Sequence, residues 1–267
     1  MSRSRTRPVT EPGRRSLAPA ERARTIIASA TGLRVGVLNL THEVGRHAVG
    51  IDGSLLFLAP ADSPGAIFRV APRLPAQVVT VTAVDVATVP QHDRIRGSLR
   101  LTGPMRPAIE PLPAGIREHL AGPDPQDVEL AGPVLRMQPT RVMLTWQCER
   151  GAGAGGPSVE IPVEEYRAAL PDPMIELESQ WLPHLLLDHT RLLRTLARAV
   201  HEGLDDSIDV RPLAMDRFGI VLRLYAEGRH LDRRLTFAKP VACGCDLREA
   251  FDDLLRRVAP DEPGFSC

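Results

Sequence analysis

The feature that most constrains the fold is a leucine-rich segment in the last third of the chain, residues 182–200. Its apolar residues are spaced by three, four and seven positions, which places them along one side of a helix. They are Leu182, Leu185, Leu186, Leu192, Leu193, Leu196 and Val200. This spacing predicts one long amphipathic helix that ends near Gly203.

Three strands and a second amphipathic helix are expected after this segment. The strands are predicted at 207–213, 220–225 and 230–237. Asp246 resembles the N-cap of the last helix, and Glu249 resembles the glutamate of a capping box. The apolar side of that helix comprises Leu247, Ala250, Phe251, Leu254, Leu255 and Val258. The order helix, three strands, helix predicts an antiparallel sheet on which both helices pack.

The first half of the chain is dominated by short strand patterns, preceded by one helix at 18–30. Asp52-Gly53, between two apolar segments, is a strong hairpin signal. Strands are predicted at 33–40, 46–50, 54–58, 77–86 and 94–103, with one interrupted strand or two short ones at 134–146. Short strands with few helices predict a small β-barrel. The expected fold class is therefore α+β, with a barrel followed by a small α-β-β-β-α domain.

A change of composition indicates where one domain ends and the next begins. The stretch from Gly151 to Gly156 is rich in glycine, and further prolines follow it, as is typical of a flexible connection. The predicted parts are a disordered tail at 1–17, a barrel domain at 18–146, a Gly/Pro-rich linker at 147–173, a small domain at 174–260 and a tail at 261–267.

Charge and cysteine content exclude several classes of protein. The chain has 33 basic and 33 acidic residues, so no strong attraction to nucleic acid or to an anionic membrane is expected. No apolar segment is long enough to span a membrane. The four cysteines do not form a disulfide framework, which favours a reducing compartment and predicts a cytoplasmic protein. Cys243 and Cys245 could ligate a metal or form a reactive pair, but they lack the second ligand pair of a structural zinc site, so no metal is expected.

Three segments of the second half resemble the small α/β domain found with flavin-type split barrels. They read Leu-Pro-His-Leu-Leu-Leu-Asp-His at 182–189, Pro-Leu-Ala-Met-Asp-Arg-Phe-Gly-Ile at 212–220 and Arg-Leu-Thr-Phe-Ala-Lys-Pro at 234–240. This domain occurs in haem-utilisation proteins and in the plant glutamyl-tRNA-reductase-binding protein. The family helix often reads His-x-Asn-x-Asp-His, and Leu186 replaces the asparagine here.

The first half resembles the pyridoxamine-phosphate-oxidase-like split barrel over residues 21–146. The segments that carry this resemblance are Arg94-Ile-Arg-Gly and Leu135-Arg-Met-Gln-Pro. Barrels of this family usually form dimers, so the resemblance implies a homodimer. Distant barrel relatives bind flavin mononucleotide (FMN).

The resemblance implies three alternative functions. The first is a non-catalytic haem- or tetrapyrrole-binding protein in haem and iron homeostasis, which could act through a partner enzyme of tetrapyrrole metabolism. The second is an oxidoreductase that uses FMN or haem as its reactive centre. The third is a protein-interaction module that has lost its ligand.

Two histidines of the leucine-rich helix are candidate haem ligands. His189 lies on the apolar side, where a neutral imidazole could bind iron or could pack and hydrogen-bond as a core residue. On a regular helix His184 lies about 140° away, near the helix start, where it is either an ordinary surface residue or able to reach a ligand between the domains. Asp188 points elsewhere on the helix, so no local dyad with His189 is expected.

Three arginines complete the candidate site. Arg94 and Arg96 share one side of a predicted strand with Arg100, which indicates either a solvated outer face or a site for a flavin phosphate. Arg217 lies in the predicted turn at 216–219 and either shapes that turn or pairs with a propionate or phosphate.

Overall fold

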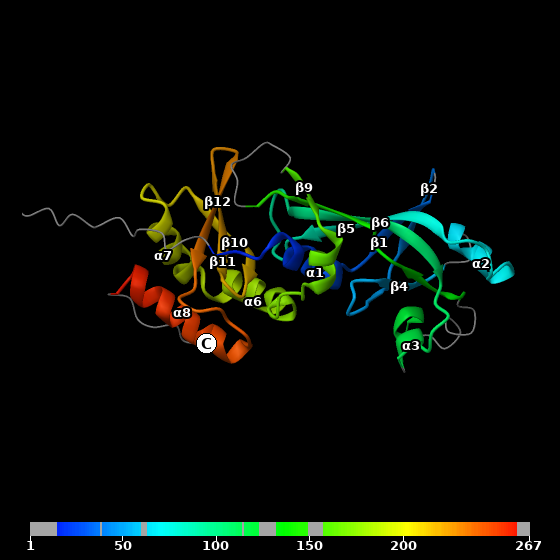
Figure 1. The fold of residues 1–267 in the computed structure, drawn as a ribbon. Coiled ribbons are helices and arrows are strands. Elements are labelled where there is room, and N and C mark those ends of the chain that lie inside the picture. The colour runs from blue at the N-terminus through cyan, green and yellow to red at the C-terminus, as the bar shows by residue number, and fades with distance from the viewer. Residues whose placement is uncertain are drawn as a thin grey trace, which may run out of the picture.

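The computed structural model describes residues 15–37, 39–59, 63–113, 115–122, 132–148 and 157–260, which form a large sheet, a small sheet and the helices around them (Figure 1). The helices are α1 Pro19–Ser29, α2 Ile67–Val70, α3 Ile116–Ala121, α5 Val163–Ala168, α6 Ile175–Asp188, α7 Thr190–Val200 and α8 Gly244–Val258, with a 3-10 helix, η1, at Pro64–Ala66. The strands are β1 Leu33–Val37, β2 Leu40–Val44, β3 Ala48–Val49, β4 Leu55–Leu58, β5 Gln77–Val86, β6 Ile95–Pro107, β7 Val134–Met137, β8 Arg141–Trp146, β9 Ser158–Ile161, β10 Asp209–Asp216, β11 Gly219–Ala226 and β12 Arg229–Thr236.

The large sheet contains nine antiparallel strands built around β6. Its order is β2-β1-β5-β6-β7-β4-β3, and β8 pairs with both β6 and β9. Because β6 is 13 residues long, it serves two partners beside each other: residues 97–102 pair with β8, and residues 105–107 pair with β7. Among the described residues no strand pairing closes the sheet. The antiparallel β unit that we predict is therefore present, but a closed barrel is not seen.

Gly103 allows the connection from β7 to β8 to cross β6 at close range. The Gln138 N–H donates to the Pro104 carbonyl (3.0 Å), and the Thr140 N–H donates to the Thr102 carbonyl (2.8 Å). A Cβ atom at residue 103 would lie 1.9 Å from the Gln138 carbonyl oxygen. Only glycine fits at this crossing without displacement of a strand.

Helices α1 and α5 cover the large sheet and complete its core. Ile26 and Ile27 of α1 and Tyr166 of α5 are buried together with strand residues such as Leu99. The Tyr166 hydroxyl donates to the Gly53 carbonyl (3.1 Å) in the β3–β4 hairpin. Gly53 has a φ of 76°, as the Asp-Gly hairpin signal predicts. Helix α1 also contacts α6, so it lies between the two sheets (Figure 1).

The range 147–173 contains more structure than a linker. β9 and α5 both lie within it, and β9 extends the large sheet through β8. Composition obscured β9 because Ile161 is the only buried residue of that strand. At the end of the predicted N-terminal tail, Leu17 is also buried. The glycine-rich stretch 151–156, residues 1–14 and residues 261–267 lie outside the described residues.

The second half forms the small antiparallel sheet, β10-β11-β12, whose three strands agree with the prediction. Helices α6, α7 and α8 share one core with it, in which Leu182, Leu185, Leu193 and Leu196 of the predicted stripe are fully buried. The prediction of a single long helix is wrong, because the chain leaves the helical conformation at His189 (φ −128°, ψ 37°) and starts a second helix. None of the described helices has the length and apolar character needed to cross a membrane.

Candidate functional site

Three side chains at the junction of α6 and α7 form a hydrogen-bonded chain. Asp188 Oδ2 lies 2.7 Å from His184 Nδ1, and His184 Nε2 lies 3.1 Å from His189 Nε2. The two imidazole rings meet edge to face, with their centroids 4.8 Å apart. The His184 side chain is 41% exposed, so solvent and ligands can reach this chain.

The break between α6 and α7 is what brings the two histidines together. On one regular helix they would lie about 140° apart. Because His189 sits between two helices, α7 does not continue the axis of α6, and the helical-wheel position does not apply. The prediction that the two histidines lie on different sides is therefore wrong. Asp188 pairs with His184, which lies four residues earlier on α6. The sequence predicts no local dyad of Asp188 with His189, and in the structure His184 lies between the two in the hydrogen-bonded chain.

The arrangement defines which nitrogen atoms can bind a metal. When Asp188 accepts the Nδ1 hydrogen of His184, the Nε2 atom of His184 carries the lone pair, and His189 Nε2 donates its hydrogen to it. A metal–imidazole bond is about 2 Å long, so an iron held between two opposed imidazoles needs nitrogen atoms about 4 Å apart. The separation of 3.1 Å is too short for that. In this arrangement one of the two histidines, not both, can serve as an axial ligand.

Apolar side chains adjoin the histidine chain. The Trp181 ring meets His184 edge-on (6.3 Å between centroids) and stacks on Phe251 of α8 (6.4 Å). Leu187, on the next turn of α6, is 77% exposed. An accessible imidazole beside aromatic and aliphatic surface suits the flat apolar face of a tetrapyrrole. These residues therefore fit a haem, with the imidazole as the iron ligand.

A second cluster lies between the two sheets and is centred on Arg96. Its guanidinium donates to both oxygens of Asp85 (3.0 and 2.6 Å) and to both oxygens of Glu178 of α6 (2.5 and 3.1 Å). Glu178 also accepts the N–H of Met215 in β10 (2.8 Å), and Arg96 donates to the Leu213 carbonyl (3.3 Å). Burial lowers the pKa of Arg96, but the Glu178 and Asp85 carboxylates outweigh it and raise that pKa well above its ordinary value.

A β-bulge turns Arg96 into the protein. Gly97 pairs with Asp85 and Ile95 pairs with Val86, so Arg96 has no partner in β5. The extra residue reverses the alternation of sides at this point. As a result Ile95 is 51% exposed, whereas Arg96 is 6% exposed. The interpretation of Arg96 as part of a solvated strand face is therefore wrong.

The surroundings of Arg94 and Arg96 do not suit a flavin phosphate. Arg96 is held by two carboxylates, which would repel a phosphate. Arg94 is exposed, and its Nε and Nη2 atoms both donate to the Ala87 carbonyl (3.1 and 2.9 Å). The cavity beside Arg96 has a volume of about 40 Å³. Pockets that hold small-molecule ligands and cofactors have volumes of about 300–1,000 Å³. The cavity beside Arg96 is therefore too small for a flavin, and these arginines do not fit a flavin phosphate.

Arg217 joins the small sheet to α1. Its Nη2 atom donates to Glu21 Oε1 (2.5 Å), and its backbone N–H lies 3.3 Å from both carboxylate oxygens of Asp172. Burial acts to raise the pKa of Glu21, but the hydrogen bonds from Arg217 and from the Ala18 N–H lower it overall. Burial raises the pKa of Asp172. Arg217 thus stabilises the contact between the units, and its pairing with Glu21 leaves it poorly placed for a propionate.

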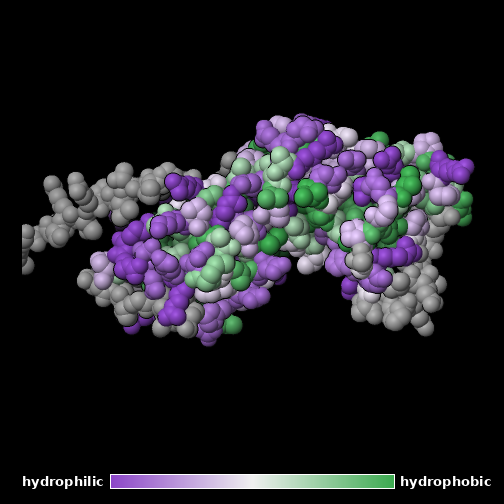
Figure 2. Space-filling model, turned by 60° about the horizontal axis from the view of Figure 1, so that its bottom comes forward, coloured by the Kyte–Doolittle hydropathy of each residue, from purple (hydrophilic) through white to green (hydrophobic). Residues whose placement is uncertain are grey.

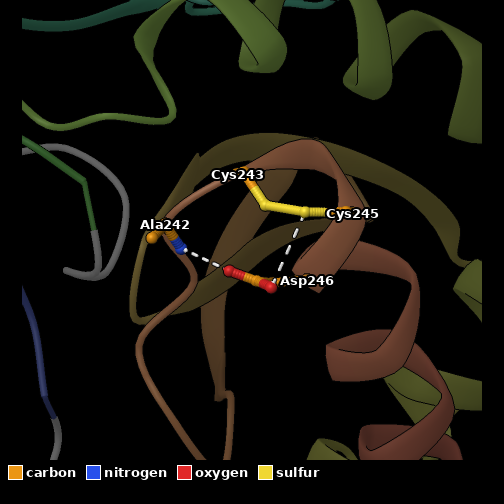
Figure 3. The surroundings of a disulfide bond; sticks show 4 residues. All are labelled: Ala242, Cys243, Cys245 and Asp246. Atoms are coloured by element: carbon orange, nitrogen blue, oxygen red, sulfur yellow. Dashed lines mark hydrogen bonds between the residues drawn. A yellow bond between two sulfur atoms is a disulfide. The ribbon is translucent and has the colours of Figure 1, made fainter.

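Cys243 and Cys245 form a disulfide. One bond between residues two positions apart is not a disulfide framework, and it agrees with the alternative that the two cysteines form a reactive pair. Figure 3 shows the bond at the start of α8, beside Asp246. Cys243 is the N-cap, so α8 begins before the N-cap that we predict at Asp246, and the Asp246 carboxylate instead accepts the Ala242 N–H (3.1 Å). The two sulfur atoms and this carboxylate lie within 4.8 Å of one another. Disulfide sulfur is not a thiolate, so this state offers no metal ligand set.

Sequence reasoning missed the carboxylates that surround Arg96. The position of Asp85 could have been predicted as buried, because it lies in phase with the inward-facing Val79, Val81 and Ala83 of the same strand. A lone carboxylate on an apolar strand side requires a buried partner. The position of Glu178 could not have been predicted in this way, since it lies on the polar side of α6 until the large sheet covers it.

These features define a class of α+β protein in which an open antiparallel sheet is joined by buried ion pairs to a small sheet with a histidine pair. No known protein family and no curated protein matches the sequence. Among solved structures, the chain is similar to a haem-binding protein from Mycobacterium smegmatis, with a TM-score of 0.60 and 20% identity over 92% of this chain and 99% of that one. It is also similar to an FAD- and haem-binding protein from the same organism, with a TM-score of 0.33 and 13% identity over 53% of this chain and 81% of that one. The first likeness shows a shared fold over nearly the whole chain, and the second is too weak to carry an argument.

Proposed function

We propose that the protein binds haem or a related tetrapyrrole at the junction of α6 and α7. The observation that carries the proposal is the Asp188–His184–His189 chain, which places an oriented, accessible imidazole beside apolar surface. The fold shared with the haem-binding protein from Mycobacterium smegmatis supports the same function. When bound, haem would supply an iron centre that an imidazole nitrogen of this chain would hold.

We assign the axial position to His184, with Asp188 as the residue that orients it. The Nδ1 atom of His184 is held by the carboxylate (2.7 Å), which leaves its Nε2 atom as the lone-pair nitrogen. Histidines that bind metals commonly have this carboxylate behind them. His189, which the sequence favours as the ligand, is then the neighbour that hydrogen-bonds to the unliganded His184.

The role that we propose is binding rather than catalysis, in haem and iron homeostasis and through a partner enzyme of tetrapyrrole metabolism. His184, the residue that would hold the iron, lies on the partly exposed surface of α6, where a partner could collect or deliver the tetrapyrrole. An oxidoreductase would enclose its reactive centre to exclude water. Haem bound to the protein should therefore keep its Soret band when a reductant and oxygen are added and should not speed the oxidation of the reductant. Loss of the band would show degradation of haem, and faster oxidation of the reductant with the band retained would favour the oxidoreductase.

Haemin titration of the full chain tests the ligand assignment. We expect a shifted Soret band with one haem per chain, and a loss of affinity of at least tenfold in His184→Ala, because the iron loses its ligand. Asp188→Asn should weaken binding by about 10–100-fold, the usual effect of removing the group that orients a metal ligand. His189→Ala should have the smallest effect of the three. The affinities are read from the Soret absorbance.

A histidine of the same unit provides the control. His201 follows α7 and has no part in the Asp188–His184–His189 chain, so His201→Ala should leave haem affinity unchanged. If His184→Ala and His189→Ala both bind haem as tightly as the parent protein, the ligand assignment is wrong even though haem binds.

We also propose that the large sheet has a split-barrel architecture and that the protein is cytoplasmic.

We further propose that the protein forms a homodimer. Figure 2 shows small hydrophobic groups among hydrophilic ones on the face that it presents. At one end of β5 and β6, Val84, Val86 and Ile95 are 44%, 42% and 51% exposed, and we propose them as part of the dimer contact. Light scattering should give twice the chain mass, and Val84→Glu should shift the protein toward the monomer. A monomeric parent protein would contradict this.

A further inference from the structure

The disulfide between Cys243 and Cys245 lies on the surface between two buried anchors. Val241 and Leu247 are 2% and 0% exposed, whereas Cys245 is exposed and Cys243 is half-buried. The Val241 N–H donates to the Arg217 carbonyl (2.8 Å), which holds the start of the segment against the small sheet. The two sulfur atoms are thus presented at a fixed position that a second molecule can reach.

This bond contributes little to the stability of the fold. It joins residues that are two positions apart, and disulfides that close the shortest loops restrict the unfolded chain least. Helix α8 is held instead by Leu247, Phe251 and Leu254, which are buried in the core of the small sheet. Stabilisation of the fold therefore does not explain the disulfide between Cys243 and Cys245, and the reactivity of its two sulfur atoms offers another role.

The two sulfur atoms are not equivalent. Cys243 is the N-cap of α8, a helix of 15 residues, where backbone N–H groups and the helix dipole stabilise a thiolate. Cys245 Sγ lies 3.8 Å from Asp246 Oδ1, and a carboxylate at this distance disfavours a second negative charge. Cys245 is also the more exposed residue. Attack is therefore expected at Cys245, with Cys243 as the leaving thiolate.

We propose that Cys243 and Cys245 form a redox-active pair that undergoes thiol–disulfide exchange with thiol or dithiol reductants. The thiolate of the reductant attacks Cys245, a new sulfur–sulfur bond forms there, and the bond to Cys243 breaks with its electron pair on Cys243. A second thiolate attacks the sulfur of the reductant, so that the reductant leaves as a disulfide and Cys245 is released. Two thiols lose two protons and two electrons, and the pair gains both as a dithiol.

Cys148 provides a contrast within the same chain. It is buried beside the Arg96 backbone, and its thiol lies 3.7 Å from the Arg96 carbonyl oxygen. Burial raises the pKa of the Cys148 thiol far above its ordinary value, so almost no thiolate forms near neutral pH. Cys148 should therefore stay unmodified in the folded protein, whereas the Cys243–Cys245 pair reacts.

Equilibration of the full chain in glutathione buffers tests the proposal. Samples are held at a series of ratios of reduced to oxidised glutathione, quenched with acid and alkylated, and the peptide with residues 243–245 is quantified by mass spectrometry. A chelator is included, because the reduced pair and Asp246 together offer three metal ligands. We expect two alkyl groups to appear together as the reduced fraction rises, and to disappear when oxidised glutathione is restored.

Single-cysteine variants test the roles of the two sulfur atoms. In Cys245→Ser the thiol of Cys243 should alkylate several-fold faster at neutral pH than the thiol of Cys245 does in Cys243→Ser, because the start of α8 stabilises a thiolate at Cys243 and the Asp246 carboxylate disfavours one at Cys245. Asp246→Asn should increase the rate at which the disulfide reacts with anionic thiols several-fold, since the repelling carboxylate is gone. Serine caps a helix well, so Cys243→Ser is expected to fold, and Cys245→Ser is expected to fold because Cys245 is exposed.

Two results would overturn the proposal. The first is a disulfide that resists glutathione in the folded protein and opens only in denaturant, which would make it a permanent structural bond. The second is a pair that stays reduced in oxidised glutathione. Equal alkylation rates in the two single-cysteine variants would overturn the assignment of Cys243 as the leaving group. None of these results depends on haem binding.

Discussion

Replacing Arg96 with methionine is expected to destabilise the protein by about 3–5 kcal/mol, because the change leaves buried charges without a partner. Asp85 and Glu178 each lose a charge-assisted hydrogen-bonding partner, and their side chains are 7% and 13% exposed. Methionine fills part of the space of the arginine stem but cannot neutralise either carboxylate. Urea unfolding followed by circular dichroism at neutral pH measures the loss.

An exposed ion pair of the same sheet provides the control. Arg141 pairs with Glu160 across β8 and β9, with side chains that are 59% and 57% exposed. Arg141→Met should leave the free energy of unfolding nearly unchanged, as is usual for a solvated pair. If Arg96→Met costs no more than Arg141→Met, the buried cluster does not stabilise the contact between the units.

The second large effect is expected at Gly103, where alanine should destabilise the protein by about 3 kcal/mol or more. The added Cβ would lie 1.9 Å from the Gln138 carbonyl oxygen, and a backbone atom cannot rotate away as a side chain can. Either β6 or the β7–β8 connection must move, and the hydrogen bonds of Pro104 and Thr102 weaken with it. A fall of the thermal midpoint and of the soluble yield measures the effect.

A glycine in open surroundings provides the comparison. Gly45, after β2, has no atom within 4 Å of an added Cβ, so Gly45→Ala should leave the thermal midpoint nearly unchanged. Equal midpoints for Gly103→Ala and Gly45→Ala would show that the crossing of β6 tolerates a side chain, and would contradict the reason given for glycine at this position.

The small sheet was predictable because each of its elements carries a regular pattern. Strand β11 reads as an apolar stretch, the turns at 216–219 and 227–228 separate it from β10 and β12, and α8 shows one apolar side over its whole length. In the leucine-rich stripe Leu182, Leu185, Leu193 and Leu196 are fully buried, while Leu186 and Leu192 are partly buried. Periodicity reports which side of a helix is covered, and in α8 the covered side is the same throughout.

The candidate site was less predictable, because a single residue changes the geometry in each part of it. His189 interrupts a helix whose periodicity continues on both sides, and this interruption places it against His184. Arg96 is the extra residue of a bulge, which reverses the side on which it lies. Patterns averaged over several residues do not detect such local irregularities. Pairing of Cys243 with Cys245 depends on backbone direction at the start of α8, which spacing alone does not define.

The ion pairs around Arg96 bear on how this polypeptide can be shortened or recombined. Arg96 lies in β6 and Glu178 lies in α6, so dividing the chain near residue 170 would place these two opposite charges on separate fragments. The same cut would uncover an apolar cluster shared by both fragments, with Ala87 on one side and Leu213 on the other. The small sheet produced alone would need new residues at that surface to remain soluble.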